Sequence, residues 1–218
     1  MKENIKTGFF YLLLVLIAFA GLGLEAVLAF VIEPPLYGCE MKSWNVTQNV
    51  LHWIMTCIIW GLVSFSVIWL ARKRQDFDLL KKGEGMQKWQ WILVILMIIF
   101  SLIISYIDWN GSKVLREYHA NGPVKFIFQY IYYCFEVMLV TLILIFGQEA
   151  CEKWFVKKNI PYGGLIVAIT WGIGHFFTKD FSTGIITMIS GLAFGSVYIL
   201  TNRDLKKSYV ILWLMFVL

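Results

Sequence analysis

Charged residues are scarce in this chain of 218 residues: they make up 15% of the sequence, against 59% hydrophobic residues. Soluble domains carry about 25% charged residues, so the composition excludes an ordinary soluble domain and predicts an integral membrane protein. The alternation of apolar and polar residues that a membrane β-barrel requires is lacking too. The sequence therefore predicts an all-α fold, a polytopic transmembrane helical bundle that forms one integral membrane domain over residues 1–218.

Metal-ligand clusters, basic tails and low-complexity tracts are also lacking. The chain has three histidines and four cysteines, and no spacing among them is typical of a zinc site or a disulfide framework. We therefore expect no metal, no cofactor and no nucleic-acid partner. The expected partners belong to the bilayer: membrane lipid and a membrane-anchored peptide or lipoprotein.

Long apolar runs occupy most of the sequence. A helix needs about 20 apolar residues to cross a bilayer, and seven segments approach this length, although the fifth and the last are short. They cover residues 9–32, 51–71, 89–107, 126–147, 163–178, 184–200 and 208–218. The first run continues well past a small-residue "AFA" stretch, which favours an uncleaved first span over a signal peptide.

Lysine and arginine are unevenly distributed among the segments that connect these spans. If the N-terminus lies in the cytoplasm, 14 of the 19 basic residues fall in cytoplasmic segments. Cytoplasmic loops of membrane proteins are enriched in positive charge. This bias predicts a multi-pass protein of the cell membrane with a cytoplasmic N-terminus.

Four ionisable side chains lie in or at the ends of the apolar spans: Glu25, His52, Glu136 and His175. A charge at the bilayer centre costs about 2.5–3.5 kcal/mol on insertion scales, so such residues are candidates for function. With a rise of about 1.5 Å per residue, all four lie in the predicted outer half of the membrane. A carboxylate and an imidazole at one depth can activate a water molecule, and Glu136 with His175 is the candidate catalytic pair.

Polar residues accompany Glu136 along its predicted helix. Gln129, Tyr132 and Tyr133 share a face with it at helical spacings of three, four and seven. Such a stripe of hydrogen-bonding groups is unsuited to lipid and indicates a face directed into the bundle. We expect Tyr132 and Tyr133 to support the site, together with Glu25 and His52.

Small residues accompany His175 in the same way. Gly164, Ala168 and Gly172 share its helix face, and Trp171 precedes it by four residues. Small residues allow a second helix to approach closely. Trp171 is a further candidate for supporting the site.

A structural role is the alternative for each of these side chains. His175 could bond to a backbone carbonyl, and Glu136 could be protonated and hold two helices together. His52 could simply mark the membrane boundary.

Two short motifs resemble those of a known family. The stretch "GQEACEKW" at 147–154 is followed by "WGIGH" at 171–175. They are similar to the EExxxR and FxxxH motifs of the CAAX-protease and bacteriocin-processing membrane family, often called CPBP. Here Gln148 stands in place of the first glutamate, Lys153 in place of the arginine, and Trp171 in place of the phenylalanine. The family's later HxxxN or HxxxD motif has no counterpart, because no histidine follows His175.

The resemblance covers roughly residues 126–218 and implies a helical membrane bundle. It also implies a glutamate and histidines that activate water, which here would be Glu149 and His175. However, Glu149 lies 13 residues beyond Glu136, about 20 Å deeper toward the cytoplasm. Its spacing from Lys153 is typical of a solvated ion pair. The resemblance thus favours Glu149 and the depth favours Glu136, and both stay open at this point.

Three functions fit these patterns. The first is a CPBP-like intramembrane hydrolase that cuts a membrane-anchored peptide or lipoprotein. Glu136 or Glu149 would be its general base, and His175 would hold the water or stabilise the oxyanion. The second is acyl transfer at the outer leaflet, as in lipoprotein N-acylation. The third is non-enzymatic: a bacteriocin-immunity or scaffold protein that binds a partner.

Overall fold

The computed structural model describes residues 2–155 and 157–218, and the regular structure within these ranges is helical throughout. The all-α prediction is therefore confirmed. Five helical segments are long and apolar enough to cross a membrane, which supports a membrane protein. They are Glu3–Tyr37, Val46–Gln75, Lys88–Asp108, Lys113–Phe155 and Phe181–Leu200.

The other two predicted spans are shorter helices. The stretch Tyr162–Thr178 is a shorter apolar helix, and α9 (Leu205–Val217) has 13 residues. At about 1.5 Å per residue, α9 is roughly 20 Å long, less than the roughly 30 Å of a hydrocarbon core. Both pack against the longer helices α5 and α8.

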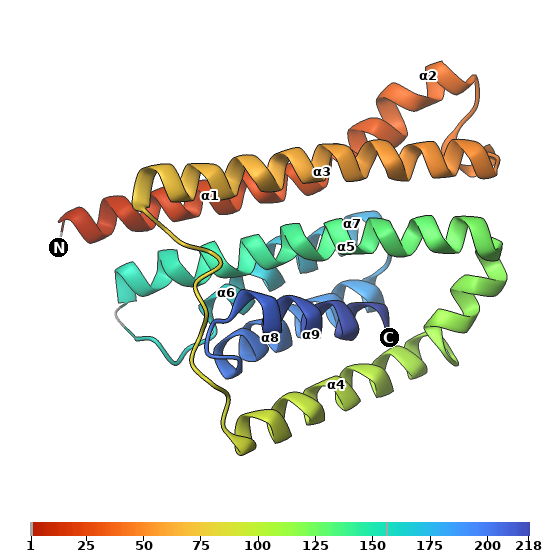
Figure 1. Ribbon diagram of the computed structural model, residues 1–218. Helices are drawn as coiled ribbons and strands as arrows, with labels where there is room; N and C mark the ends of the chain where they lie inside the picture. The colour runs from red at the N-terminus through yellow and green to blue at the C-terminus, as the bar shows by residue number, and fades with distance from the viewer. Residues whose placement is uncertain (1, 156) are drawn as a thin grey trace.

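The first helical segment changes character near its end. Helix α1 (Lys2–Val27) passes through a π-helical turn, Leu28–Ile32, into the short α2 (Glu33–Tyr37), which stops at Gly38 with a φ of 68°. Positive φ suits glycine because it has no Cβ. Helix α3 (Val46–Gln75) then begins at an Asn45 capping box. Figure 1 shows α2 beside the start of α3, at the end of the bundle opposite the N-terminus; we call this the α2 end.

Helix α5 (Lys113–Phe155) is the central helix of the bundle. Gly122 (φ 68°, ψ 173°) breaks it, and Pro123 starts the longer part. Helix α4 (Lys88–Asp108) leads into the short part, which bends back at the α2 end (Figure 1). In the long part, nearly every side chain from Val137 to Cys151 is buried. The predicted span 126–147 lies inside this helix, and protein encloses its second half, whereas Ile127 and Ile131 in its first half are exposed.

Helices α6 and α8 pack closely through glycines. The predicted fifth span comprises α6 (Tyr162–Val167), a π-helical turn (Ala168–Gly172) and α7 (Ile173–Thr178). A Cβ on Gly164 would lie 2.8 Å from the carbonyl oxygen of Gly191 in α8 (Phe181–Leu200). The expected close approach at the small-residue face is therefore present.

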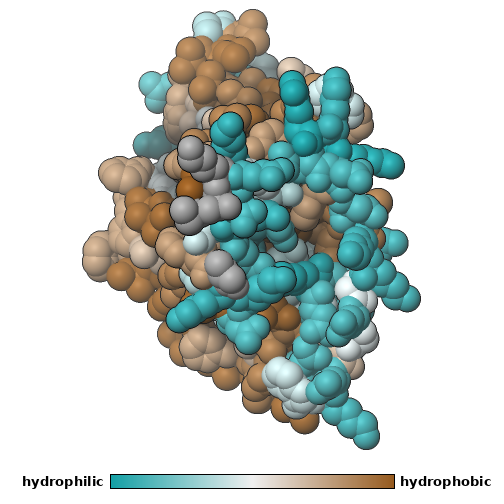
Figure 2. Space-filling model, turned by 90° about the vertical axis from the view of Figure 1, so that its left-hand side faces the viewer, coloured by the Kyte–Doolittle hydropathy of each residue, from teal (hydrophilic) through white to brown (hydrophobic). Residues whose placement is uncertain are grey.

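The basic segments gather at the other end of the bundle. The N-terminus, the α3–α4 loop, the α5–α6 connection and the α8–α9 turn lie together there (Figure 1). Figure 2 shows hydrophilic side chains gathered on this face, which we call the basic end. Hydrogen bonds join its segments: Gly83 donates to Asp204, and the Gln90 amide donates to Asn202 at 2.7 Å.

Candidate functional site

Trp171 connects the two residues of the predicted catalytic pair. Its indole Nε1–H donates to Glu136 Oε1 at 3.1 Å, and its carbonyl oxygen lies 2.8 Å from His175 Nδ1. The π-helical turn carries Trp171, and α7 carries His175 one turn later. The rings of Trp171 and His175 also meet edge to face, with centroids 4.8 Å apart. One residue thus contacts both a carboxylate of α5 and an imidazole of α7.

This arrangement fixes the hydrogen on the neutral His175 ring. A carbonyl oxygen only accepts hydrogen bonds, so Nδ1 must carry the hydrogen. Nε2 then holds a lone pair that can accept a hydrogen from water or substrate. The structural alternative, a histidine bonded to a carbonyl, accounts for one ring nitrogen and leaves the other free for chemistry.

Of the other predicted site residues, Tyr132 and Glu25 lie in the same part of the bundle as this pair. Tyr132 is buried against Trp60, with ring centroids 4.7 Å apart. Glu25, from α1, lies close enough for its charge to act on both Glu136 and His175. Side chains of α1, α5 and α7 thus share one polar region inside the bundle.

His52 is buried inside the protein, near the start of α3. Its side chain is about 2% exposed, and its Nδ1 lies 2.6 Å from Glu33 Oε2 of α2. Its Nε2 faces Glu25 Oε1 at 3.7 Å. The reason is that α3 begins at Val46, six residues before His52, and α2 folds over this first part of α3.

Tyr133 belongs to a separate hydrogen-bond network across the break in α5. Its hydroxyl donates to Glu117 Oε1 at 2.6 Å, and Tyr130 donates to Glu117 Oε2 at 3.0 Å. Gln129 joins the network by donating to Glu117 and Tyr133. The polar stripe predicted on one face is therefore divided: Gln129 and Tyr133 hold the short part of α5, and Glu136 contacts Trp171.

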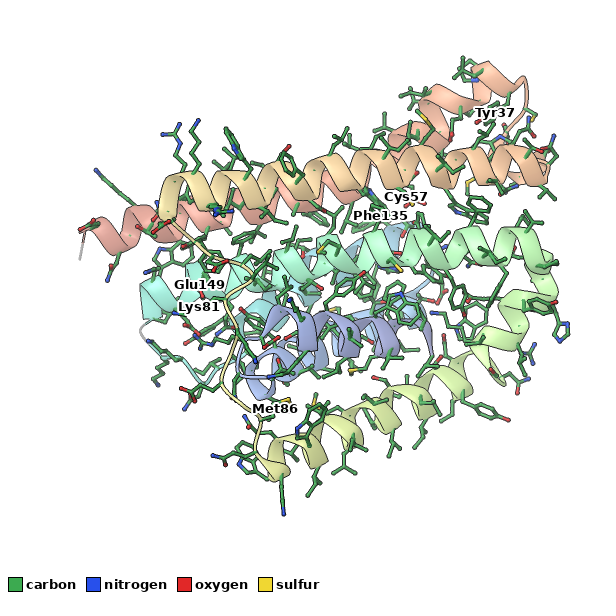
Figure 3. All side chains as sticks on the ribbon, viewed as in Figure 1. Tyr37, Cys57, Lys81, Met86, Phe135 and Glu149 are labelled. Atoms are coloured by element: carbon green, nitrogen blue, oxygen red, sulfur yellow. The ribbon has the colours of Figure 1, made fainter. Side chains whose placement is uncertain are left out.

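Glu149 lies toward the basic end (Figure 3), whereas α7, the helix of His175, lies farther toward the α2 end (Figure 1). It lines a cavity of about 1160 Å³ together with Lys81, Lys158 and Arg203. The predicted ion pair with Lys153 is wrong, since no such pair lies within 4.0 Å in the part of the chain described. Instead Glu152, three residues on, binds Arg203 at 3.0 Å. Glu136 shares the contact residue Trp171 with His175, whereas Glu149 lines the cavity at the basic end.

Gln148, which matches the first glutamate of the family motif, has a packing role. It is fully buried, and its Oε1 accepts a hydrogen bond from the backbone N–H of Gly163 at 2.9 Å. Its Nε2 donates to the carbonyl of Ile160. Gln148 therefore anchors the start of α6 to α5.

Sequence reasoning missed two buried acids. Glu33 and Glu117 are each 3% exposed. Glu33 follows the predicted first span by one residue and lies eight residues after Glu25, a spacing that repeats a helix face. Glu117 lies between the predicted spans 89–107 and 126–147, in a stretch that no apolar run marks as helical.

The site offers acid–base groups on a rigid scaffold. Among residues 2–155 and 157–218, no group of three or more His, Cys, Asp or Glu side chains is placed to hold a metal ion. Comparisons with family models, with curated proteins and with solved structures find no match to this chain.

Proposed function

We propose that this protein is a CPBP-like intramembrane hydrolase that cuts a membrane-anchored peptide or lipoprotein. The observation that carries the proposal is the bridge from Glu136 through Trp171 to His175. Placing ionisable side chains inside a membrane bundle costs free energy, so a carboxylate and an imidazole that contact the same tryptophan there are candidates for function. The resemblance of "WGIGH" to the family's FxxxH motif supports the same residues.

Glu136 is the general base in this mechanism. Trp171 occupies Oε1, so Oε2 is the oxygen that takes a proton from water. The Nε2 lone pair of His175 accepts the second hydrogen of the same water and orients it. As the water oxygen bonds to the substrate carbonyl carbon, the carbon–nitrogen bond breaks, and Glu136 passes its proton to the leaving amine.

A groove beside the site favours a lipid-bearing substrate. It lies between α3 and α5, has a volume of about 410 Å³, and is lined by apolar side chains that include Cys57, Ile131 and Phe135 (Figure 3). Ile131 and Phe135 directly precede Tyr132 and Glu136 in α5. This groove keeps outer-leaflet acyl transfer as the second candidate, because both reactions need a lipid chain near the polar region.

We also propose how the chain is arranged in the membrane. All seven apolar segments lie in the bilayer, with Tyr162–Thr178 and α9 sheltered by the longer helices. The N-terminus and the basic end are cytoplasmic, which follows from the positive charge there. The Glu136–His175 region then lies in the outer half of the membrane, where an anchored substrate exposes its first residues.

Mass spectrometry of membrane proteins tests the reaction directly. Membranes are compared from cells that lack the protein, carry the wild type, or carry Glu136→Gln at matched abundance. Hydrolysis predicts new peptide termini with the wild type only. Acyl transfer predicts instead that a lipoprotein terminus gains the mass of an acyl group. If neither change is found, the non-enzymatic function is favoured.

His175→Ala serves as the second variant in this comparison. We expect it to abolish the new termini while the protein stays in the membrane at near-normal abundance. His119→Ala is the matched control, because His119 is exposed at the α2 end. Wild-type cleavage by His175→Ala would contradict the proposed role of the imidazole.

A further inference from the structure

The Glu33–His52 pair is built like a proton-transfer unit. Glu33 Oε2 and His52 Nδ1 are 2.6 Å apart, and both side chains are less than 5% exposed. A carboxylate fixes a hydrogen on the ring nitrogen it faces, so Nδ1 carries that hydrogen. The opposite nitrogen is then available to gain or lose a second proton.

That opposite nitrogen points at another carboxylate. His52 Nε2 lies 3.7 Å from Glu25 Oε1, which is longer than a hydrogen bond. Nε2 and Glu33 Oε1 are both buried without a hydrogen-bond partner in the part of the chain described. Glu25 is 33% exposed, so it has room to move toward the ring, or one water can bridge the gap.

Glu33, His52 and Glu25 lie between the α2 end and the Glu136 region. Glu33 belongs to α2, and Tyr37 of the same helix lies at the α2 end (Figure 3). On the other side, Glu25 lies close enough to Glu136 for the two charges to interact. Glu25 and Glu33 are the charged groups that face the His52 ring.

We infer that Glu33, His52 and Glu25 form a proton relay between the α2 end of the protein and the buried Glu136 region. Three separate helices contribute to the relay, and the Glu33–His52 contact exists whether or not the protein hydrolyses a substrate. The relay therefore goes beyond the proposed function, to which it would supply protons.

The transfer balances through the two ring nitrogens. A proton leaves the Glu25 carboxyl and binds Nε2 of His52, while the proton on Nδ1 passes to Glu33. Glu25 ends as a carboxylate and Glu33 as a carboxylic acid, and His52 stays neutral in its other tautomer. Transfer in the opposite direction restores the first state.

Hydrogen–deuterium exchange of the buried carboxyl groups tests the relay. The protein is placed in lipid nanodiscs, transferred rapidly to D₂O, and followed by the infrared C=O band of protonated carboxyls. The spectra are recorded at the pH where this band is largest. Subtracting the spectra of Glu25→Gln and Glu136→Gln from that of the wild type assigns the band to individual carboxyls. His52→Gln should slow its exchange by about 10²-fold, the usual scale for a positioned proton carrier.

Two further variants make the result decisive. His119→Gln removes an exposed imidazole and should leave the exchange rate unchanged. Glu33→Gln keeps an oxygen that accepts from Nδ1 but cannot take its proton, so it should slow exchange even if His52→Gln fails to fold. Wild-type exchange rates in folded His52→Gln or Glu33→Gln would refute the relay and leave a static ion pair. Because no substrate is needed, this outcome is independent of hydrolysis.

Discussion

At the scale of single residues, the account depends on Trp171. Its ring packs between Phe194 and Phe216, so its position is set by aromatic contacts that do not need the indole nitrogen. The N–H group is therefore a separate feature that can be removed alone. The sequence indicated that Trp171 supports the site, because it lies one turn before His175, but nothing in the sequence showed that its N–H reaches Glu136.

Trp171→Phe should keep the packing and remove the hydrogen bond to Glu136. A hydrogen bond to a charged group contributes about 1.5–3 kcal/mol, and we expect activity to fall at least roughly 10-fold. The measurement is the amount of new membrane-peptide termini at matched protein abundance. Trp213→Phe is the control, because the buried Trp213 Nε1 has no partner in the described residues. Equal activity in both variants would count against a role for the indole N–H.

At the scale of helices, apolar runs predicted which segments are helical but not where helices end. The predicted span 126–147 is part of the 43-residue α5, because the more polar stretches on either side of it are helical as well. Glu33 and Glu117 were missed for the same reason: they lie outside the apolar runs but are enclosed by helices from elsewhere in the chain. Long-range contacts of this kind leave no local pattern.

The approach of α6 to α8 gives a prediction at this scale. Gly164→Ala should destabilise the protein by about 1–3 kcal/mol, because the added Cβ meets the α8 backbone. Gly174→Ala is the matched control, since a Cβ there meets nothing within 4 Å. That change should be neutral or stabilising by about 0.5–1 kcal/mol. Thermal unfolding in detergent measures both, and equal melting temperatures would rule out the tight contact.

At the scale of the whole molecule, the basic segments of the sequence gather at one end of the structure, which makes its two ends different. The four segments with 14 of the 19 basic residues lie far apart in the sequence but together in space (Figures 1 and 2). Sequence could assign each of them to one side, because the positive-inside rule is additive over loops. Sequence could not show that Glu152–Arg203 and Gly83–Asp204 contacts tie these segments together.

Single cysteines test which end faces the cytoplasm. In a variant without the four native cysteines, Lys42→Cys should react with a membrane-impermeant thiol reagent in intact cells. Lys157→Cys should react only after the cells are opened. Both positions are exposed, one at the α2 end and one at the basic end. The reverse pattern would place the Glu136 region in the inner half of the membrane.

The central claim is that Glu136 is the general base, and a pair of glutamate substitutions tests it most directly. Glu136→Gln keeps the shape and removes the base, so cleavage of membrane-anchored peptides should fall by about 10²-fold or more. Glu149→Gln, in the basic-end cavity, should cleave nearly as well as the wild type. Both are measured at matched abundance in cells that otherwise lack the protein. Loss of cleavage in Glu149→Gln alone would contradict the account and assign the base to the glutamate that the family resemblance implies.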